Sequence, residues 1–141
     1  MKDKESYFKR LDAVVRSAER HNVGLIPSLF WNIATFPDLV GESMDQLGNP
    51  ESETIAFIEQ YTAEVVQRYR NSPAIWGWEF GNEYNLNVDL PNASSHRPKV
   101  VPHLQTGLER TSRDELSSGH MLTAFGHFAR TVRTYDAHRI S

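Results

Sequence analysis

The sequence predicts an α/β fold in which buried parallel strands alternate with amphipathic helices. Two apolar runs, 23–30 and 74–81, have the length of buried strands and lead directly into polar side chains. Segments with apolar residues at helical spacing lie before, between and after these runs. The loops that follow the two strands are much longer than those that lead into them, which is typical of folds whose functional face is built after the strands.

The first predicted element is a one-sided helix over about residues 4–20. Its apolar positions are Tyr7, Phe8, Leu11, Val14, Val15 and Ala18. After His21-Asn22, the run from Val23 to Phe30 is apolar on both faces and predicts a strand. Pro27 removes one hydrogen-bond donor from this strand, so we expect a bulge there.

An irregular segment to about Pro50 separates this strand from a second helix. Asn49-Pro50-Glu51 favours a helix start, because an early proline removes an N–H that would have no intrahelical partner. The helix stops before Pro73. Its apolar positions are Ile55, Ile58, Tyr61, Val65 and Tyr69.

The second strand runs from Ala74 to Gly81 and continues into Asn82-Glu83-Tyr84. Strict alternation predicts two faces. One face packs against helices and carries Trp76, Trp78 and Phe80, and the other carries Ile75, Gly77, Glu79, Gly81 and Glu83.

A loop over residues 85–111 follows, and a loop of that length in a compact domain is usually functional. Ser112-Arg113-Asp114-Glu115 has the form of a capping box and predicts a helix to about Asp136. His138 to Ser141 predict the start of a further strand. Two or three strands cannot close a barrel of about 250 residues, so we expect residues 1–141 to be an incomplete segment of one larger domain. The alternative, a small flavodoxin-type domain, would need about five parallel strands.

Composition excludes several classes of function. The formal net charge is −3 and the basic residues are scattered, so we expect no nucleic-acid partner. No run predicts a membrane span, the N-terminus has no apolar signal region, and the absence of cysteine leaves the compartment open. The histidines predict no metal site, because His120 and His127 lie two helical turns apart and His96 and His103 have no carboxylate at ligand spacing.

The stretch Ile75-Trp76-Gly77-Trp78-Glu79-Phe80-Gly81-Asn82-Glu83 resembles the fourth barrel strand of clan A glycoside hydrolases, the family-5-like cellulase and mannanase enzymes. The segments 69–74 and 136–141 are similar to the leads into the fourth and fifth strands of that clan. The resemblance implies a partial (β/α)₈ TIM barrel, from about helix 2 to helix 4 with strands 3 and 4.

The resemblance also implies a retaining hydrolase of β-linked polysaccharides or oligosaccharides. Glu83 would be the general acid/base, and Asn82 would hydrogen-bond the sugar 2-hydroxyl. A general acid needs an apolar surround and a neighbouring carboxylate to hold its proton. Glu79, in mid-strand, fits a salt-bridged structural role, and it stands roughly 13 Å from Glu83 along a strand, too far to be the catalytic partner. The clan's nucleophile, on a seventh strand, is missing here, so we expect the isolated chain to be inactive.

Further candidates border the same strand ends. Trp31 and Asn32 follow the first strand, and Trp31 would either stack on a sugar or pack under its own loop. Tyr84 opens the long loop and would line a subsite. No cofactor is implied, and the expected partners are a β-linked carbohydrate and the remainder of the barrel. Two alternatives stay open: a non-catalytic carbohydrate-binding or interaction module on the same scaffold, and an unrelated small α/β domain. The family resemblance alone suggests an extracellular or periplasmic location.

Overall fold

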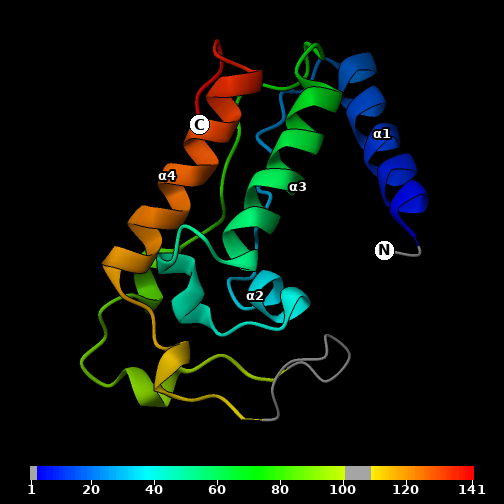
Figure 1. Ribbon diagram of the computed structural model, residues 1–141. Coiled ribbons are helices and arrows are strands. Elements are labelled where there is room, and N and C mark those ends of the chain that lie inside the picture. Colours follow the sequence, from blue (N-terminus) through cyan, green and yellow to red (C-terminus); the bar gives the residue numbers. More distant parts are fainter. Residues whose placement is uncertain (1–2, 101–108) are drawn as a thin grey trace.

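The computed structural model describes residues 3–100 and 109–141 and has a layer of helices over extended segments (Figure 1). The helices α1 (Lys4–His21), α3 (Glu53–Tyr69) and α4 (Ser118–Tyr135) lie side by side, with α2 (Thr35–Val40) and the 3-10 helix η1 (Met44–Gly48) at one end. The short 3-10 helices η2 (Tyr84–Asn87), η3 (Ala93–His96) and η5 (Ser112–Asp114) belong to the long segment before α4. None of the described helices is long and apolar enough to cross a membrane.

The predicted strands are found as extended segments joined by isolated bridges. Leu25 pairs with Ile75, Ser28 pairs with Glu79, and Gly77 pairs with Ile140, all in the parallel sense. The predicted parallel arrangement of 23–30 and 74–81 is therefore confirmed, and the segment after α4 adds a third neighbour in chain order. Continuous strands are not formed in the described residues, so the prediction of regular strands was wrong.

A bulge interrupts the first pairing at Pro27. The paired residues are offset by 50 positions at Leu25–Ile75 and by 51 at Ser28–Glu79, so one extra residue lies in the second segment. Pro27 has no N–H to donate, and its carbonyl accepts from the Glu79 N–H at 3.0 Å. The bulge expected at Pro27 is confirmed, and it breaks the alternation of side chains in the segment opposite.

The bulge changes which side chains of the second segment are covered. Ile75, Trp78 and Phe80 are all buried in the core, whereas Trp76 is 66% exposed. The Trp76 ring rests on Gly24, where a Cβ would lie 2.2 Å from the ring. The predictions that Trp76 packs against helices and that Ile75 lies on the opposite face from Trp78 and Phe80 were wrong, because both assumed unbroken alternation.

The core lies between the helices and the extended segments. Four of its aromatic rings come from four different parts of the chain, and their centroids are close: 4.9 Å for Phe30–Phe80, 5.0 Å for Phe30–Phe36 and 5.5 Å for Phe80–Phe128. Since aromatic pairs at such spacings are favourable, this cluster fixes both extended segments against α2 and α4.

The helix boundaries follow caps that the sequence only partly indicated. The first helix agrees with its predicted range. The cap of α3 is Ser52, whose hydroxyl accepts from the Ile55 N–H at 3.1 Å, so the helix starts later than predicted. The capping box ending at Asp114 belongs to η5, and α4 starts at Ser118 with Ser117 as its own cap. The irregular segment before α3 contains α2 and η1, which periodicity did not predict.

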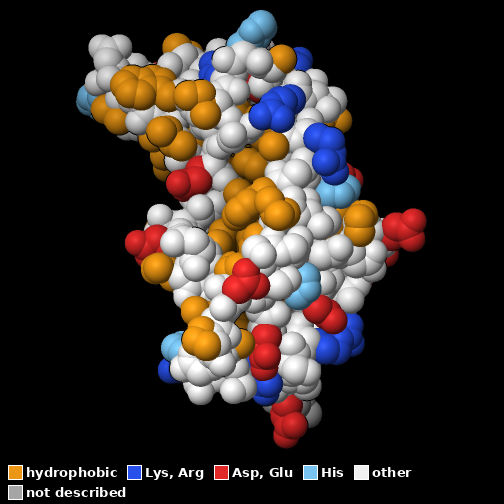
Figure 2. All heavy atoms as spheres, turned by 90° about the vertical axis from the view of Figure 1, so that its left-hand side faces the viewer, with side chains coloured by type: hydrophobic (Ala, Val, Ile, Leu, Met, Phe, Trp, Pro, Cys, Tyr) orange, Lys and Arg blue, Asp and Glu red, His pale blue; other side chains and the backbone are white. Residues whose placement is uncertain are grey.

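One side of the extended segments lacks a helical cover. Val23, Ile26, Trp76 and Ile140 are exposed by 51%, 62%, 66% and 81%. Hydrophobic side chains are also seen at the surface over the upper part and middle of the side drawn in Figure 2. The predicted exposure of apolar residues beside the extended segments is therefore confirmed.

Asp12 joins α1 to α3 and should make stability depend on acid. Its carboxylate accepts from Arg68 Nε and Nη2 at 2.9 and 2.7 Å and from Tyr69 Oη at 2.6 Å, and these bonds hold the pKa of Asp12 well below its usual 3.8. A lowered folded-state pKa stabilises the fold above the unfolded value, and that contribution is lost as pH falls below about 3.8. We expect Asp12→Asn to lower Tm at pH 7 and to flatten the fall of Tm in acid, measured by thermal unfolding from pH 7 to pH 2. Parallel profiles for the variant and the parent would contradict this.

Candidate active site

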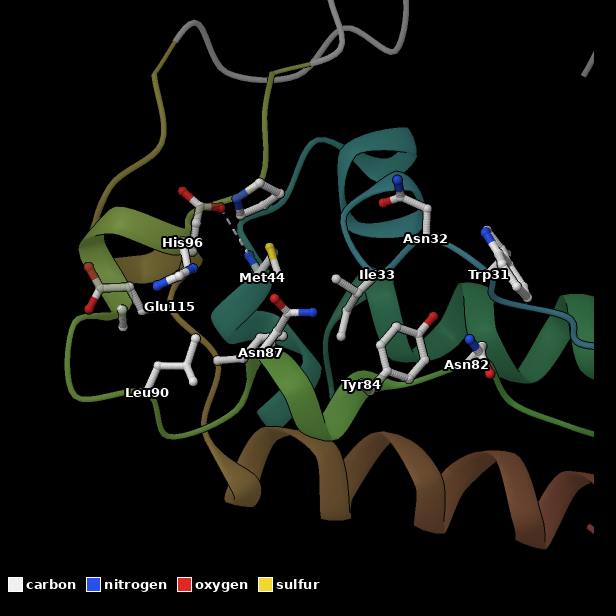
Figure 3. A pocket seen from close by; sticks show the side chains of 14 residues that line it. Trp31, Asn32, Ile33, Met44, Asn82, Tyr84, Asn87, Leu90, His96 and Glu115 are labelled. Atoms are coloured by element: carbon white, nitrogen blue, oxygen red, sulfur yellow. Dashed lines mark hydrogen bonds between the residues drawn. The ribbon is translucent and has the colours of Figure 1, made fainter.

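A cavity of about 270 Å³ lies where the two extended segments end. The first segment contributes Trp31, Asn32 and Ile33, and the second contributes Asn82 and Tyr84 (Figure 3). The remaining wall comes from η1 and from the segment between Tyr84 and α4; it consists of Met44, Asn87, Leu90, Ala93, His96, Pro98, Asp114, Glu115 and Leu116. Four of the five predicted site residues therefore line one cavity.

Glu83 stands between two lining residues without lining the cavity itself. Its side chain is exposed, so the described residues do not supply the apolar surround that a general acid needs. Its φ is 57°, in the left-handed region that costs a residue with a Cβ roughly 1 to 2 kcal/mol. The Glu83 carbonyl accepts from the Leu86 N–H at 3.0 Å and so starts η2. This turn allows both neighbours, Asn82 and Tyr84, to reach the cavity.

Trp31 and Asn32 lie at the rim. Trp31 is 68% exposed, so the reading in which it packs under its own loop was wrong. Asn32 Oδ1 accepts from the Ala34 N–H at 3.0 Å and holds the turn into α2. Both residues also border a second, more apolar cavity of about 390 Å³ between α1, α2 and α3.

Tyr84 is held firmly in the cavity wall. Its ring packs on Phe80 with centroids 5.5 Å apart, and it lies so close to Gly81 that a Cβ there would be 2.4 Å from Tyr84 Cε2. The same Cβ would be 2.5 Å from the Phe30 carbonyl oxygen, so only glycine fits at position 81. Burial and the nearby charge of Glu79 raise the pKa of Tyr84 well above 10, so its hydroxyl remains a hydrogen-bond donor.

Glu79 is half-buried beside Ser28. The salt bridge predicted for it is not formed with any residue in the described ranges, 3–100 and 109–141. Its clearest described effect is electrostatic, through the pKa of Tyr84.

Two arginines fix the far wall of the cavity. Arg110 donates from Nη1 and Nη2 to the two Asp38 oxygens at 2.8 and 2.7 Å, and its Nη1 lies 3.4 Å from Asp114 Oδ1. Arg97 pairs with Glu115. Sequence reasoning missed these residues because they lie in a segment without periodicity. The only signal was the predicted capping box Ser112–Glu115, and the box in the structure lies one residue earlier, from Thr111 to Asp114.

The histidines do not come together in the described part of the chain. His96 lines the cavity, His127 Nδ1 lies 2.6 Å from Glu59 Oε1, and His120 Nδ1 accepts from the Ser117 N–H at 3.3 Å. Position 103 lies outside the described residues. Across 3–100 and 109–141, no group of three or more His, Asp or Glu side chains could hold a metal ion.

We expect Arg110→Met to destabilise the protein by about 3 kcal/mol, because the loss of one partner leaves the buried Asp38 carboxylate uncompensated. Adding Asp38→Asn should recover part of the loss, since that change removes the unpaired charge. Urea unfolding of both variants measures the effect. A decrease in the free energy of unfolding of less than about 0.5 kcal/mol would contradict a buried Arg110–Asp38 ion pair, because exposed pairs contribute that little.

No family profile matches the chain. It is 36% identical over 125 residues to a probable mannan endo-1,4-beta-mannosidase A-2 of Aspergillus terreus, across 82% of the chain and 29% of that protein. Mannan endo-1,4-beta-mannosidase A of Hypocrea jecorina is 30% identical over 123 residues, across 82% of the chain and 26% of that protein. The chain thus spans less than a third of the length of these relatives. The similarities support a relationship to a glycoside hydrolase family.

Proposed function

We propose that the chain is a segment of a retaining β-glycoside hydrolase domain of (β/α)₈ type and that it supplies the general acid/base, Glu83. One observation carries the proposal. Residues from two separate segments, Trp31 and Asn32 from one and Asn82 and Tyr84 from the other, line a single cavity beside Glu83. The strained backbone of Glu83 adds support, because strain of this kind gathers at functional sites.

The arrangement of the segments supports a barrel over a flavodoxin-type sheet. Three parallel segments follow one another in chain order, with helices on one side and exposed apolar residues on the other. A barrel needs this order, because each strand pairs with the next and the inner face is filled by side chains from all strands. The remainder of the barrel would cover the exposed side.

The chemistry requires a second carboxylate from outside this chain. A retaining pair stands about 5–5.5 Å apart, and Glu79 is too far along its segment to meet that distance from Glu83. The proposed nucleophile therefore belongs to the remainder of the domain. Asn82 would hydrogen-bond the sugar 2-hydroxyl, and the exposed ring of Trp31 would stack on a sugar face.

The proposed substrate is a β-linked polysaccharide or oligosaccharide. The names of the relatives make β-1,4-linked mannan the first polymer to test. A neutral substrate suits the cavity, because Asp114 and Glu115 on its wall are already paired with arginines.

In the full-length protein, we expect Glu83→Gln to lower kcat/KM on β-1,4-mannan by about 10²- to 10⁴-fold, the usual contribution of a general acid/base. Formation of the glycosyl-enzyme from a dinitrophenyl β-glycoside should fall far less, because that leaving group departs without a proton. The exposed Glu51→Gln serves as the control and should leave both rates unchanged. Equal losses on the two substrates would contradict the acid/base role. Turnover by the isolated chain that Glu83→Gln abolishes would contradict the missing nucleophile.

Trp31→Ala should weaken oligosaccharide binding by the full-length protein about 3- to 10-fold while leaving Tm unchanged, because the ring is exposed and contributes by stacking. Leu122→Ala is the control, since Leu122 is 72% exposed on α4 and does not line the cavity. Isothermal titration calorimetry measures both affinities. Equal effects of the two changes would argue against a sugar platform at Trp31.

A further inference from the structure

Tyr84 differs from Tyr69 in the core and from the half-buried Tyr61 in what its hydroxyl contacts. Tyr69 Oη donates to Asp12 Oδ1 at 2.6 Å, and Tyr61 Oη pairs with Tyr7 Oη. Only 6% of Tyr84 is exposed, and its Oη is buried without a hydrogen-bond partner in the described part of the chain. Because burying a hydroxyl without a partner is unfavourable, this group should have a partner in the working protein.

The position of the ring limits where that partner can be. Phe80 and Gly81 hold the ring from the core side, so the hydroxyl has little freedom to move. Figure 3 shows the ring between Asn87 and Asn82, with its hydroxyl turned toward the side on which Asn32 and Asn82 lie. Among the described residues and the cavity that they line, the available partner is therefore a molecule in the cavity.

The groups around the hydroxyl indicate the chemistry of that molecule. Three asparagine side chains line the same cavity, and each offers one acceptor and two donor hydrogens. Arg97 is paired with Glu115, and Arg110 is shared between Asp38 and Asp114, so neither arginine is left unpaired for an anionic ligand. A neutral ligand with several hydroxyl groups matches this set of donors and acceptors.

We propose that Tyr84 determines specificity by donating a hydrogen bond from its hydroxyl to a hydroxyl group of a neutral sugar residue bound in this cavity. This inference rests on the proposed function and adds a donor that the acid/base assignment does not require. It also explains an unpartnered buried hydroxyl, since a site built to hydrogen-bond a ligand leaves its own polar group unpaired when empty.

The test compares two tyrosines in the full-length protein carrying Glu83→Gln, so that substrate is not consumed. Tyr84→Phe removes the unpartnered hydroxyl, and Tyr69→Phe removes one that is bonded within the chain. Binding of β-1,4-linked mannohexaose is measured by calorimetry and Tm by thermal unfolding. We expect Tyr84→Phe to weaken binding by about 10-fold with Tm unchanged or raised. Tyr69→Phe should lower Tm and leave the affinity unchanged.

Other results would contradict either this inference or the proposed function. Equal affinity of the Tyr84→Phe variant and its parent would overturn the inference, and so would a fall in Tm as large as that of Tyr69→Phe, because the hydroxyl would then have a structural partner. If mannohexaose binds and Trp31→Ala weakens it while Tyr84→Phe does not, only this inference fails. If the parent does not bind mannohexaose, the tyrosine comparison is repeated with cellohexaose, and if the parent binds neither, the proposed function fails and this inference fails with it.

Discussion

The parallel pairing between segments 23–30 and 74–81 is the constraint on which the site depends. It brings the end of one segment, at Trp31 and Asn32, beside the end of the other, at Asn82 and Tyr84. One missing N–H, that of Pro27, sets the register of this pairing, because the second segment must take an extra residue where proline cannot donate. The bulge opposite Pro27 thus affects which side chains of the second segment are buried in the core.

Different contacts hold the paired segments at the two ends of the molecule. Near the site, aromatic rings from both segments and from α2 and α4 form a cluster that holds Phe80, and through it the ring of Tyr84. At the other end, Trp78 Nε1 donates to Asp136 Oδ2 at 2.9 Å, and Arg139 bonds the same carboxylate at 2.8 Å. Arg139 also donates to the carbonyl of Ile75 at 2.6 Å. The segment that leads to Asn82 and Glu83 is therefore held at Ile75 and Trp78 by hydrogen bonds and at Phe80 by aromatic packing.

Periodicity predicted the long helices and the direction of the extended segments well, because those features depend on local spacing of apolar residues. It could not predict the faces of 74–81, since alternation there is broken by a proline about fifty residues earlier in the chain. The rim residues Trp31, Asn32, Asn82 and Tyr84 were found from their place after apolar runs. The far wall of the cavity was not predicted, because Arg110 and Asp38 are 72 positions apart in the sequence. No local pattern of residues indicates such a long-range contact.

The backbone at Glu83 has a consequence for how this position can change. Glycine adopts a positive φ without the steric cost that a side chain incurs, so the substitution that relaxes this turn best is also the one that deletes the carboxylate. If Glu83 has the proposed acid/base role, stability and chemistry are opposed at this position. Glycine or asparagine would fit this backbone at lower cost than glutamate.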